Sequence, residues 1–341
     1  MSKARGVIGL DIGSVAIKFV ALDEGHRVGA HGIVPRLAHG GEVSLEEACR
    51  IRSILERRGI ESTRIAMGAP ATMATSAVLE LPPRSSGAPI DDLGRMEIAR
   101  IMRAEPDAVE FVCWEIPFAA RASSGTTVMG VGCISDRAAE LVGTFADAGL
   151  TVESIEPECV AVARAASAWC EAESCVTIDL GASSGRVCVV VRGMVAMERD
   201  LGELGVLDRL ARASGESGLS VAALRRMIGH RPEGEATTPR STVSDTLASE
   251  IAEDAVRAVR ESVAYVHGRA SDTAVERVCL CGWGAEIPGL AGKIRAELGV
   301  QTMAIGPECA IGERGSPVFA LAAGLALGVQ DERGKKRGTR S

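Results

Sequence analysis

The feature that most constrains the fold of this chain is a short motif that occurs twice, about half a chain apart. Its first copy lies at 8–14 (IGLDIGS) and its second at 176–182 (VTIDLGA). In each copy the Asp is followed after seven positions by a basic residue, Lys18 in the first and Arg186 in the second. A motif repeated at this distance predicts two structural units of the same topology within one chain.

The order of predicted elements supports the repeat. Short apolar runs predict three strands at the start of each half, and later a helix and a further strand. Ser44 and Glu47 form a capping box at the start of the first helix. This order is typical of a ribonuclease-H-like half, so we expect an α/β protein with two such halves. The predicted elements are 7–11, 17–22, 28–34, 44–58 and 64–68 in the first half, and 176–179, 187–191, 195–199, 244–267, 278–281 and 288–298 in the second.

Each predicted half carries an insert. The insert of the first half follows the pattern strand, helix, strand, strand, helix, which predicts a compact α+β unit. The insert of the second half is small and polar, with weak helical patterns. The predicted domains are a first lobe at 1–72, continued by 150–172 and 313–330, its insert at 73–149, a second lobe at 173–202, continued by 244–312, its insert at 203–243, and a disordered basic tail at 331–341.

The composition argues against nucleic acid as a partner. The chain has a formal net charge of −7 and only 3% aromatic residues. It therefore lacks the overall basic charge and the stacking side chains that nucleic-acid binding uses. The basic end of the chain is a local exception, for which a lipid- or partner-binding role is the alternative to a solvated end. Its residues are Arg333, Lys335, Lys336, Arg337 and Arg340.

The ten cysteines do not form a disulfide or zinc pattern. No CxxC pair occurs, and most cysteines stand singly in apolar runs, where a thiol behaves as a small apolar side chain. Cys279 and Cys281 would lie on the same side of a strand and would bind a metal only with help from elsewhere. Free thiols in this number imply a reducing compartment. The cysteines assigned to the core are Cys133, Cys159, Cys175, Cys188 and Cys279.

The sequence shows neither a targeting segment nor a membrane span. The N-terminal apolar run is interrupted by Asp11 and is far too short for a signal peptide. No apolar run approaches the length needed to cross a bilayer. The protein is therefore expected to be cytoplasmic and to reach a membrane only through partners.

The first copy of the motif has the residues of a phosphate-binding hairpin. Asp11 ends a strand, and Gly13 permits a turn tight enough for backbone N–H groups to face a phosphate. Ser14 adds a hydroxyl donor, and Lys18 adds a countercharge. The alternative is an ordinary hairpin, in which Asp and Gly serve only the turn.

The second copy supplies matching groups from the other half. Two such hairpins facing each other across a cleft would hold the β- and γ-phosphates of a nucleotide from both sides. Their two carboxylates, Asp11 and Asp179, would hold Mg²⁺ through water, which suits a hard cation that keeps its hydration shell. The residues predicted to contact the phosphates from the second half are Gly181, Ala182, Ser183 and Ser184.

A third segment completes a candidate nucleotide site. The apolar strand that ends near Cys281 is followed by Gly282, Trp283 and Gly284, and Pro288 suits the first position of a helix. The two glycines would let an adenine or a ribose approach the backbone closely. The alternative is a plain link between a strand and a helix.

Together, these three segments resemble the nucleotide site of the actin-like ATPase superfamily, which includes heat-shock chaperones and sugar kinases. Further motifs are similar to those of PilM-type assembly proteins of bacterial pili, in the FtsA-like branch. The resemblance covers about 5–330. Its motifs are LDIGS at 10–14 with Lys18 and Val20, LELP at 79–82, the acidic helix at 96–99, AGL at 148–150, IEPE at 155–158, AVARA at 161–165 and the closing segment 315–328.

The resemblance implies a nucleotide-binding scaffold. The 73–149 insert would correspond to the subdomain called 1C, and the 203–243 insert to subdomain 2B. ATP and Mg²⁺ would bind between the lobes, with Asp11, Glu156 and Asp179 as the catalytic carboxylates. Glu156 would lie on the hinge between the halves, where it would either orient the attacking water or simply face the solvent. The chain is expected to be at most a slow ATPase.

The resemblance also implies a partner. PilM-like proteins hold the cytoplasmic N-terminal peptide of a PilN-like inner-membrane protein in the machine that assembles a type IV pilus or a related secretion apparatus. That peptide is expected in the groove between the first half and the 73–149 insert. ATP would bias lobe closure and hence the affinity for the partner. The chain would then be peripheral to the inner membrane through this partner, and self-association is left open.

The sequence departs from the family pattern at the nucleotide site. Gly185 stands where the family usually has a Thr in the second hairpin, so Ser183 or Ser184 would have to supply that hydroxyl. Leu224 and Met227 stand where the family has a Glu and a Lys that reach the adenosine. A neighbouring arginine would have to take their place. These departures are the reason to expect slow hydrolysis.

Other functions of the same fold stay open on the sequence. A small-molecule kinase would need a substrate-side base and a larger second insert, and neither is identifiable. A dehydratase-activator ATPase would bridge a cluster with thiolates, which would have to come from Cys133, Cys170 or Cys175. An FtsA-like filament former is disfavoured because 331–341 lacks an amphipathic membrane helix.

Overall fold

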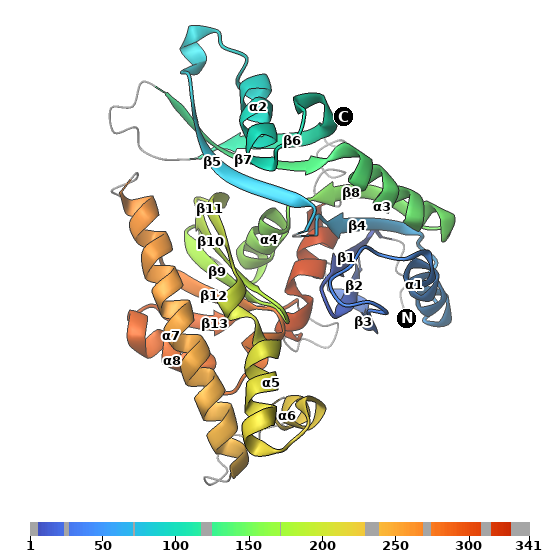
Figure 1. The fold of residues 1–341 in the computed structure, drawn as a ribbon, viewed down its shortest axis with the longest axis vertical. Helices are drawn as coiled ribbons and strands as arrows, with labels where there is room; N and C mark the ends of the chain where they lie inside the picture. The colour runs from blue at the N-terminus through green and yellow to red at the C-terminus, as the bar shows by residue number, and fades with distance from the viewer. Residues whose placement is uncertain are drawn as a thin grey trace.

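Two five-stranded sheets of the same topology form the body of the protein (Figure 1). The computed structural model describes residues 6–23, 27–70, 72–116, 125–170, 172–228, 239–268, 274–307 and 315–328. The predicted tail at 331–341 lies outside these residues. Within them, no helix is both long enough and apolar enough to cross a membrane.

The sheet of the first half has the order β3-β2-β1-β4-β8. Its first three strands are antiparallel neighbours, whereas β1, β4 and β8 run parallel. Helix α1 (Leu45–Arg57) covers one face, and its N-terminus carries the predicted capping box of Ser44 and Glu47. The strands are β1 (Ile8–Ile12), β2 (Ala16–Leu22), β3 (Val28–Pro35), β4 (Arg64–Gly68) and β8 (Thr151–Glu156).

The sheet of the second half repeats this order as β11-β10-β9-β12-β13. The register also repeats, because Asp11 pairs with Lys18 across the first hairpin and Asp179 pairs with Arg186 across the second. The predicted α/β fold with two ribonuclease-H-like halves is confirmed. The strands are β9 (Cys175–Leu180), β10 (Gly185–Val191), β11 (Met194–Leu201), β12 (Arg277–Cys281) and β13 (Gln301–Ala304).

Two helices lie between the sheets and join the halves (Figure 1). One is α4 (Glu158–Cys170), and the other spans 320–328 near the end of the described chain. Small buried residues, mostly Ala and Cys, line their contact with both sheets. A narrow, largely alanine-lined packing layer lets two sheets and two helices approach closely.

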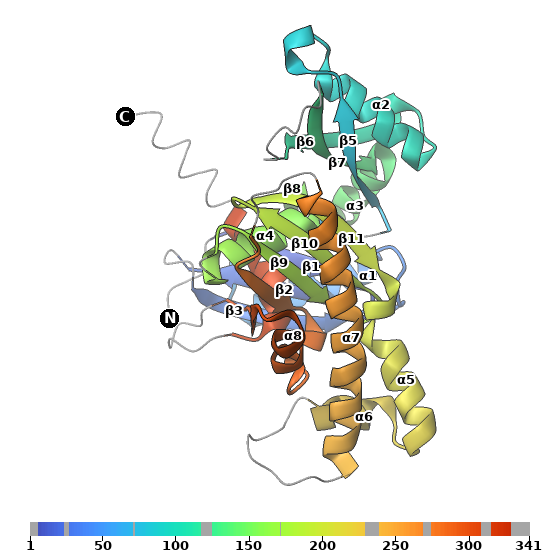
Figure 2. The same ribbon diagram turned by 90° about the vertical axis from the view of Figure 1, so that its left-hand side faces the viewer.

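The helices of the second half cover the other face of its sheet. Helices α5 (Val206–Ser217) and α6 (Val221–Ile228) form the small insert beside the long α7 (Pro239–His267), as Figure 2 shows. Helix α7 begins five residues before the predicted start at Ser244, because Pro239 suits a first helical turn. Helix α8 (Leu290–Leu298) begins two residues after Pro288, and its N-cap is Gly289 with φ +80°, so the predicted start at Pro288 is wrong.

The insert of the first half is a three-stranded sheet with the order β5-β7-β6. Helix α2 (Ile90–Met102) packs on one face. The strands are β5 (Ala74–Leu81), β6 (Val109–Glu115) and β7 (Thr126–Ile134), and short 3₁₀ turns at Arg84–Ser86 and Pro106–Ala108 flank α2.

The insert packs against the first half and also contacts the second half, which its place in the sequence does not indicate. Helix α3 (Ser135–Asp147) contributes Leu141 and Phe145 to the core of the first half. On the other side, the indole N–H of Trp114 donates to the Val195 carbonyl of β11 at 2.7 Å. The insert therefore touches both halves, although the chain enters and leaves it from the first half alone.

The described cysteines are free thiols. Of the five that the sequence assigns to the core, Cys159, Cys175, Cys188 and Cys279 are buried, whereas Cys133 is partly exposed on β7. Among the described residues, no group of three or more His, Cys, Asp or Glu side chains is arranged to hold a metal ion directly.

Candidate functional site

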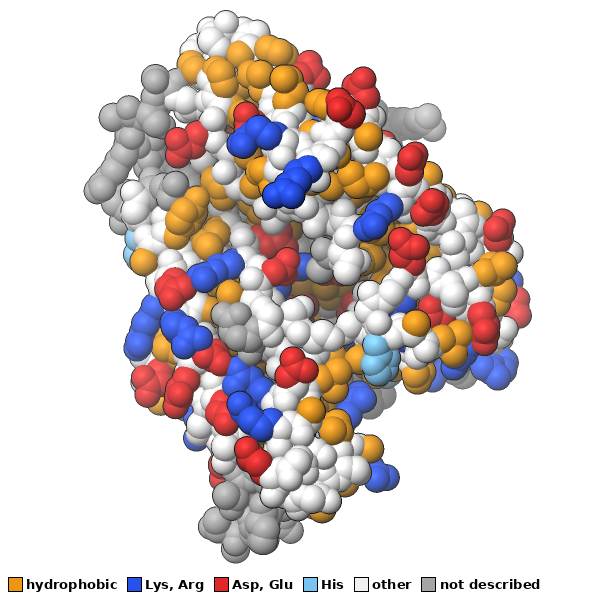
Figure 3. All heavy atoms as spheres, viewed as in Figure 1, with side chains coloured by type: hydrophobic (Ala, Val, Ile, Leu, Met, Phe, Trp, Pro, Cys, Tyr) orange, Lys and Arg blue, Asp and Glu red, His pale blue; other side chains and the backbone are white. Residues whose placement is uncertain are grey.

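A cavity of about 390 Å³ opens between the two halves and the insert. Figure 3 shows the hollow on this face, below the insert, with charged side chains inside it. Both repeated hairpins line the cavity, so the structure brings the two copies of the motif to one site. A volume of this size is within the range of small-ligand and cofactor pockets, which is about 300–1,000 Å³.

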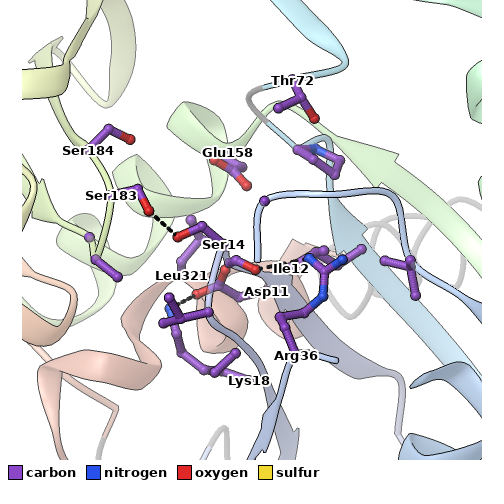
Figure 4. A pocket seen from close by; sticks show the side chains of 18 of the residues that line it. Asp11, Ile12, Ser14, Lys18, Arg36, Thr72, Glu158, Ser183, Ser184 and Leu321 are labelled. Atoms are coloured by element: carbon purple, nitrogen blue, oxygen red, sulfur yellow. Dashed lines mark hydrogen bonds and ion pairs between the residues drawn. The ribbon is translucent and has the colours of Figure 1, made fainter. Parts of the chain in front are cut away.

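The first hairpin places its predicted residues at the cavity. Asp11, Gly13, Ser14 and Lys18 all line it, and Figure 4 shows the side chains of Asp11, Ser14 and Lys18 close together. The amide of Gly13 donates to the Ala16 carbonyl at 3.1 Å and closes the turn. Lys18 Nζ lies 2.5 Å from Asp11 Oδ2 in an ion pair whose carboxylate side chain is 7% exposed.

The second hairpin faces the first directly. The Ser183 hydroxyl donates to the Ser14 hydroxyl at 2.8 Å, across the cleft between the halves (Figure 4). Behind it, the N-terminus of α5 donates the Leu207 amide to the Ala182 carbonyl at 2.9 Å, which fixes the turn. Gly181 and Ser184 also line the cavity.

The charges in the cavity perturb one another. Burial raises the pKa of Asp179, and Asp11 raises it further, although Lys18 opposes both effects. Burial by itself would lower the pKa of Lys18, but the charges of Asp11 and Asp179 outweigh burial and raise it. Two carboxylates and one lysine thus form a compact charged cluster at the meeting point of the hairpins.

Glu158, rather than Glu156, lines the cavity together with Asp11 and Asp179. Glu156 ends β8, forms an ion pair with Arg164 at 2.9 Å and is absent from the described lining of the cavity. Glu158 begins α4, lines the cavity and lies 2.6 Å from Arg186 of the second half. The assignment of Glu156 to water activation stays a prediction, and the geometry favours Glu158 for any acid–base role.

The environment of Glu158 raises its pKa to about 7. Burial is the main cause, and the charges of Asp11 and Asp179 add to it, whereas Arg186 opposes it. Arg186 is itself buried and also pairs with Glu198 at 2.9 Å. A carboxyl group with a pKa near 7 can both take up and release a proton at neutral pH.

Replacing Glu158 with Gln should remove a pH dependence of folding stability. The pKa of Glu158 is raised above its ordinary value of 4.5 to about 7. Its stabilising contribution is therefore fully present below about pH 4.5 and is lost as the pH rises through about 7. This change corresponds to about 3 kcal/mol. Urea unfolding should show wild type losing about 2.5 kcal/mol relative to Glu158→Gln between about pH 5 and about pH 8, because part of the contribution is already lost at pH 5.

Glu153→Gln is the matched control for this experiment. Glu153 is on β8 and pairs with Arg64, and its pKa is lowered mainly by that hydrogen bond. Its contribution is therefore constant across the same pH window, so the control should keep the wild-type slope. Equal slopes for wild type and Glu158→Gln would contradict the assignment of a raised pKa to Glu158.

The third predicted segment reaches the cavity through Trp283 alone. Gly282 and Gly284 are outside the described lining. A Cβ atom on Gly282, which has φ +78°, would lie 2.3 Å from Asp179 Oδ1, so the close approach of β9 requires a glycine there. The role of Gly282 and Gly284 toward a nucleotide stays a prediction. Trp283 does line the cavity, and the Arg225 guanidinium lies 5.1 Å from the centroid of its ring.

Two departures from the family pattern have a structural explanation. A Cβ atom on Gly185 would lie 2.4 Å from the Leu204 Cβ, so a hydroxyl residue does not fit there. Ser183 supplies a hydroxyl at the cleft instead. Leu224 is buried in the core of the second half, and Arg225 is the neighbour that lines the cavity. The side chain of Met227 lies outside the described part of the chain.

Comparison with known proteins identifies the fold and the family. The chain resembles a solved PilM–PilN type IV pilus biogenesis complex with a TM-score of 0.72 and 18% identity, over 95% of this chain and 98% of that chain. It resembles the ethanolamine utilization protein EutJ from Carboxydothermus hydrogenoformans with a TM-score of 0.56 and 15% identity, over 94% and 89%. It resembles MreB5 of Spiroplasma citri bound to ADP with a TM-score of 0.51 and 12% identity, over 99% of both chains.

These structures share the actin-like ATPase fold, which is therefore the fold of this chain. No curated protein sequence matches the sequence of this chain. The sequence profile of the type IV pilus assembly protein PilM, however, matches residues 9–329, nearly the whole chain. The chain thus belongs to the PilM family of type IV pilus assembly proteins.

Proposed function

We propose that this chain is a nucleotide-responsive scaffold of a type IV pilus or a related secretion machine. It binds MgATP between its halves and the cytoplasmic N-terminal peptide of a PilN-like inner-membrane protein beside its insert. The observation that carries the proposal is the cavity, which extends from the two hairpins to α3 of the insert. The likeness to a PilM–PilN complex supports the choice of partner.

The residues present fit MgATP. Ser14 and Ser183 face each other where a phosphate group would enter, and their mutual hydrogen bond would be exchanged for bonds to phosphate oxygens. Asp11 and Asp179 provide the carboxylates for a water-mediated Mg²⁺. Burial raises the pKa of Asp179 and the charge of Asp11 raises it further, so a cation between the two carboxylates would favour their charged forms. Bound Mg²⁺ would neutralise phosphate charge, and Lys18 would supply a fixed countercharge.

The groove for the peptide lies between the first half and the insert. Pro70 and Met73 line one part of it, and Arg137, Glu140 and Thr144 of α3 line the other. Both apolar and charged side chains line this groove, so it suits an extended peptide with small apolar anchors and at least one charged group. Through such a peptide the protein would be held at the cytoplasmic face of the inner membrane.

The structure disfavours the dehydratase-activator alternative. A cluster bridged between two copies needs thiolates at the surface, but Cys170 is fully buried and Cys175 is 1% exposed. Cys133 is partly exposed, and burial raises the pKa of its thiol, which disfavours the thiolate. None of these three cysteines therefore combines exposure with a stabilised thiolate.

ATP incubated with the protein should remain largely intact. The cleft lacks the family's second-hairpin Thr, because Leu204 leaves no room for a side chain at Gly185. We therefore expect turnover far below the roughly 10 per second of a median enzyme. Phosphate release under saturating MgATP measures this rate, and the nucleotide recovered with the protein should be ATP. Turnover near 10 per second would contradict the scaffold assignment and favour the kinase class.

A further inference from the structure

A buried arginine, Arg36, to which we assign no contact with phosphate, links the first hairpin to the neighbouring loop. Arg36 is 7% exposed and forms an ion pair with the equally buried Glu47 at 2.7 Å. Its guanidinium donates to the carbonyl of Gly13 at 3.2 Å, and to the carbonyls of Gly41 and Glu42 at 2.7 and 2.9 Å. One side chain thus holds the phosphate hairpin, the loop and the start of α1 together.

Backbone hydrogen bonds join the same two segments. The Gly40 amide donates to the Ser14 carbonyl at 2.9 Å, and the Arg36 amide donates to the Val15 carbonyl at 2.9 Å. Residues 36–44, here called the 36–44 loop, have exposed side chains from Leu37 to Glu42. The tip of the loop is therefore held by hydrogen bonds rather than by packing, and such segments are the ones that move at low cost.

The 36–44 loop also forms a wall of the groove. Gly40, Gly41, Glu42 and Val43 line the same cavity as Arg137, Glu140 and Thr144 of α3. Arg36 lines it beside the first hairpin (Figure 4). A phosphate group that displaces Ser14 would also shift the loop, because the Gly40 amide is bonded to the Ser14 carbonyl. A peptide that shifts the loop would, through the same hydrogen bonds, shift the hairpin.

We propose that the 36–44 loop couples nucleotide binding to peptide binding, with Arg36 as the positioning residue that makes the loop and the hairpin move together. This inference rests on the proposed function. Coupling of this kind is reciprocal, so MgATP must change the peptide affinity by the same factor by which the peptide changes the MgATP affinity. Measured couplings between sites in proteins are typically about 5- to 150-fold.

Arg36→Lys is the variant that tests the role of the Arg36 guanidinium. Lysine keeps a positive charge beside Glu47, but it lacks the planar guanidinium that bridges three carbonyls. The probe is a synthetic peptide of the cytoplasmic N-terminal segment of the PilN-like partner, titrated into the full chain with and without MgATP. In wild type we expect MgATP to change the peptide Kd at least about fivefold. In Arg36→Lys this factor should fall below about twofold.

Arg64→Lys is the matched control. Arg64 forms a two-pronged pair with Glu153 between β4 and β8, in the same sheet but outside the lining of the cavity. It should keep the wild-type coupling factor. A wild-type factor in Arg36→Lys would overturn the inference. Failure of wild type to bind either MgATP or the peptide would instead overturn the proposed function, and the coupling with it.

Hydrogen–deuterium exchange on the wild-type chain tests the same claim without a variant. Adding MgATP should slow exchange in the 36–44 loop, including the amide of Gly40, as well as in the two hairpins. Protection confined to the hairpins would show that the loop does not respond to nucleotide and would overturn the inference even if Arg36→Lys failed to fold.

Discussion

Asp11→Asn should weaken MgATP binding by about 10- to 100-fold while the protein stays folded. The carboxylate lies near the end of β1, at the meeting point of the hairpins, and is the group that would hold the cation's water shell. Charge-assisted hydrogen bonds contribute about 1.5–3 kcal/mol, and each 1.4 kcal/mol is a tenfold change in Kd. Isothermal titration of MgATP into wild type and variant measures the difference.

Asn is preferred to Ala at this position because Asp11 is more buried than its sequence position suggests. Its side chain is 7% exposed and is paired with Lys18. Asn keeps the shape and one oxygen acceptor, so the packing around it survives. Asp107→Asn, at an exposed turn of the insert, is the control and should bind as wild type does. A variant Asp11→Asn that is folded by circular dichroism and binds MgATP with wild-type affinity would show that this carboxylate does not face the cation.

Thr144→Arg should abolish most of the peptide affinity and leave MgATP binding unchanged. Thr144 lies on α3, lines the cavity on the groove side and donates its hydroxyl to the Glu140 carbonyl within the helix. An arginine there would fill the space that the peptide needs. Central interface positions contribute 2 kcal/mol or more, which corresponds to a loss of at least about 30-fold. Fluorescence anisotropy of the labelled peptide measures this loss.

Ala146→Arg is the control on the same helix, because Ala146 is exposed and does not line the cavity. A point substitution is also a cleaner test than removal of the insert. Phe145 is fully buried and Leu141 is 7% exposed, and both belong to the core of the first half. A deletion that includes α3 would therefore expose that core. Wild-type peptide affinity in Thr144→Arg would exclude the groove as the docking site.

The parts of the fold that follow from local sequence were predictable. Each hairpin is defined by an apolar strand, an Asp and a Gly turn, which are local signals, and their repetition revealed the two halves. Gly205, by contrast, packs against the second hairpin, where a Cβ atom would lie 2.4 Å from the Ser183 carbonyl. The sequence shows a glycine there but not what approaches it, because the approach depends on how α5 is placed.

The remainder of the site depends on contacts between distant segments. Glu156 and Glu158 are two residues apart, and only the junction of β8 with α4 decides that the second one faces the cavity. Arg36 has no motif that would mark it, because its partners are backbone carbonyls and a glutamate eleven positions away. The contact of Trp114 with Val195 spans 81 positions and requires the relative placement of the insert and the second half.

The central claim is that the two repeated hairpins form one nucleotide site, and titration of the wild-type chain with MgATP tests it most directly. The account predicts saturable binding of one MgATP per chain, which weakens when Mg²⁺ is chelated because Asp11 and Asp179 would then face the phosphates without a cation between them. Absence of binding heat at millimolar MgATP, together with an unchanged melting temperature, would contradict it. The hairpins would then serve only to join the two halves.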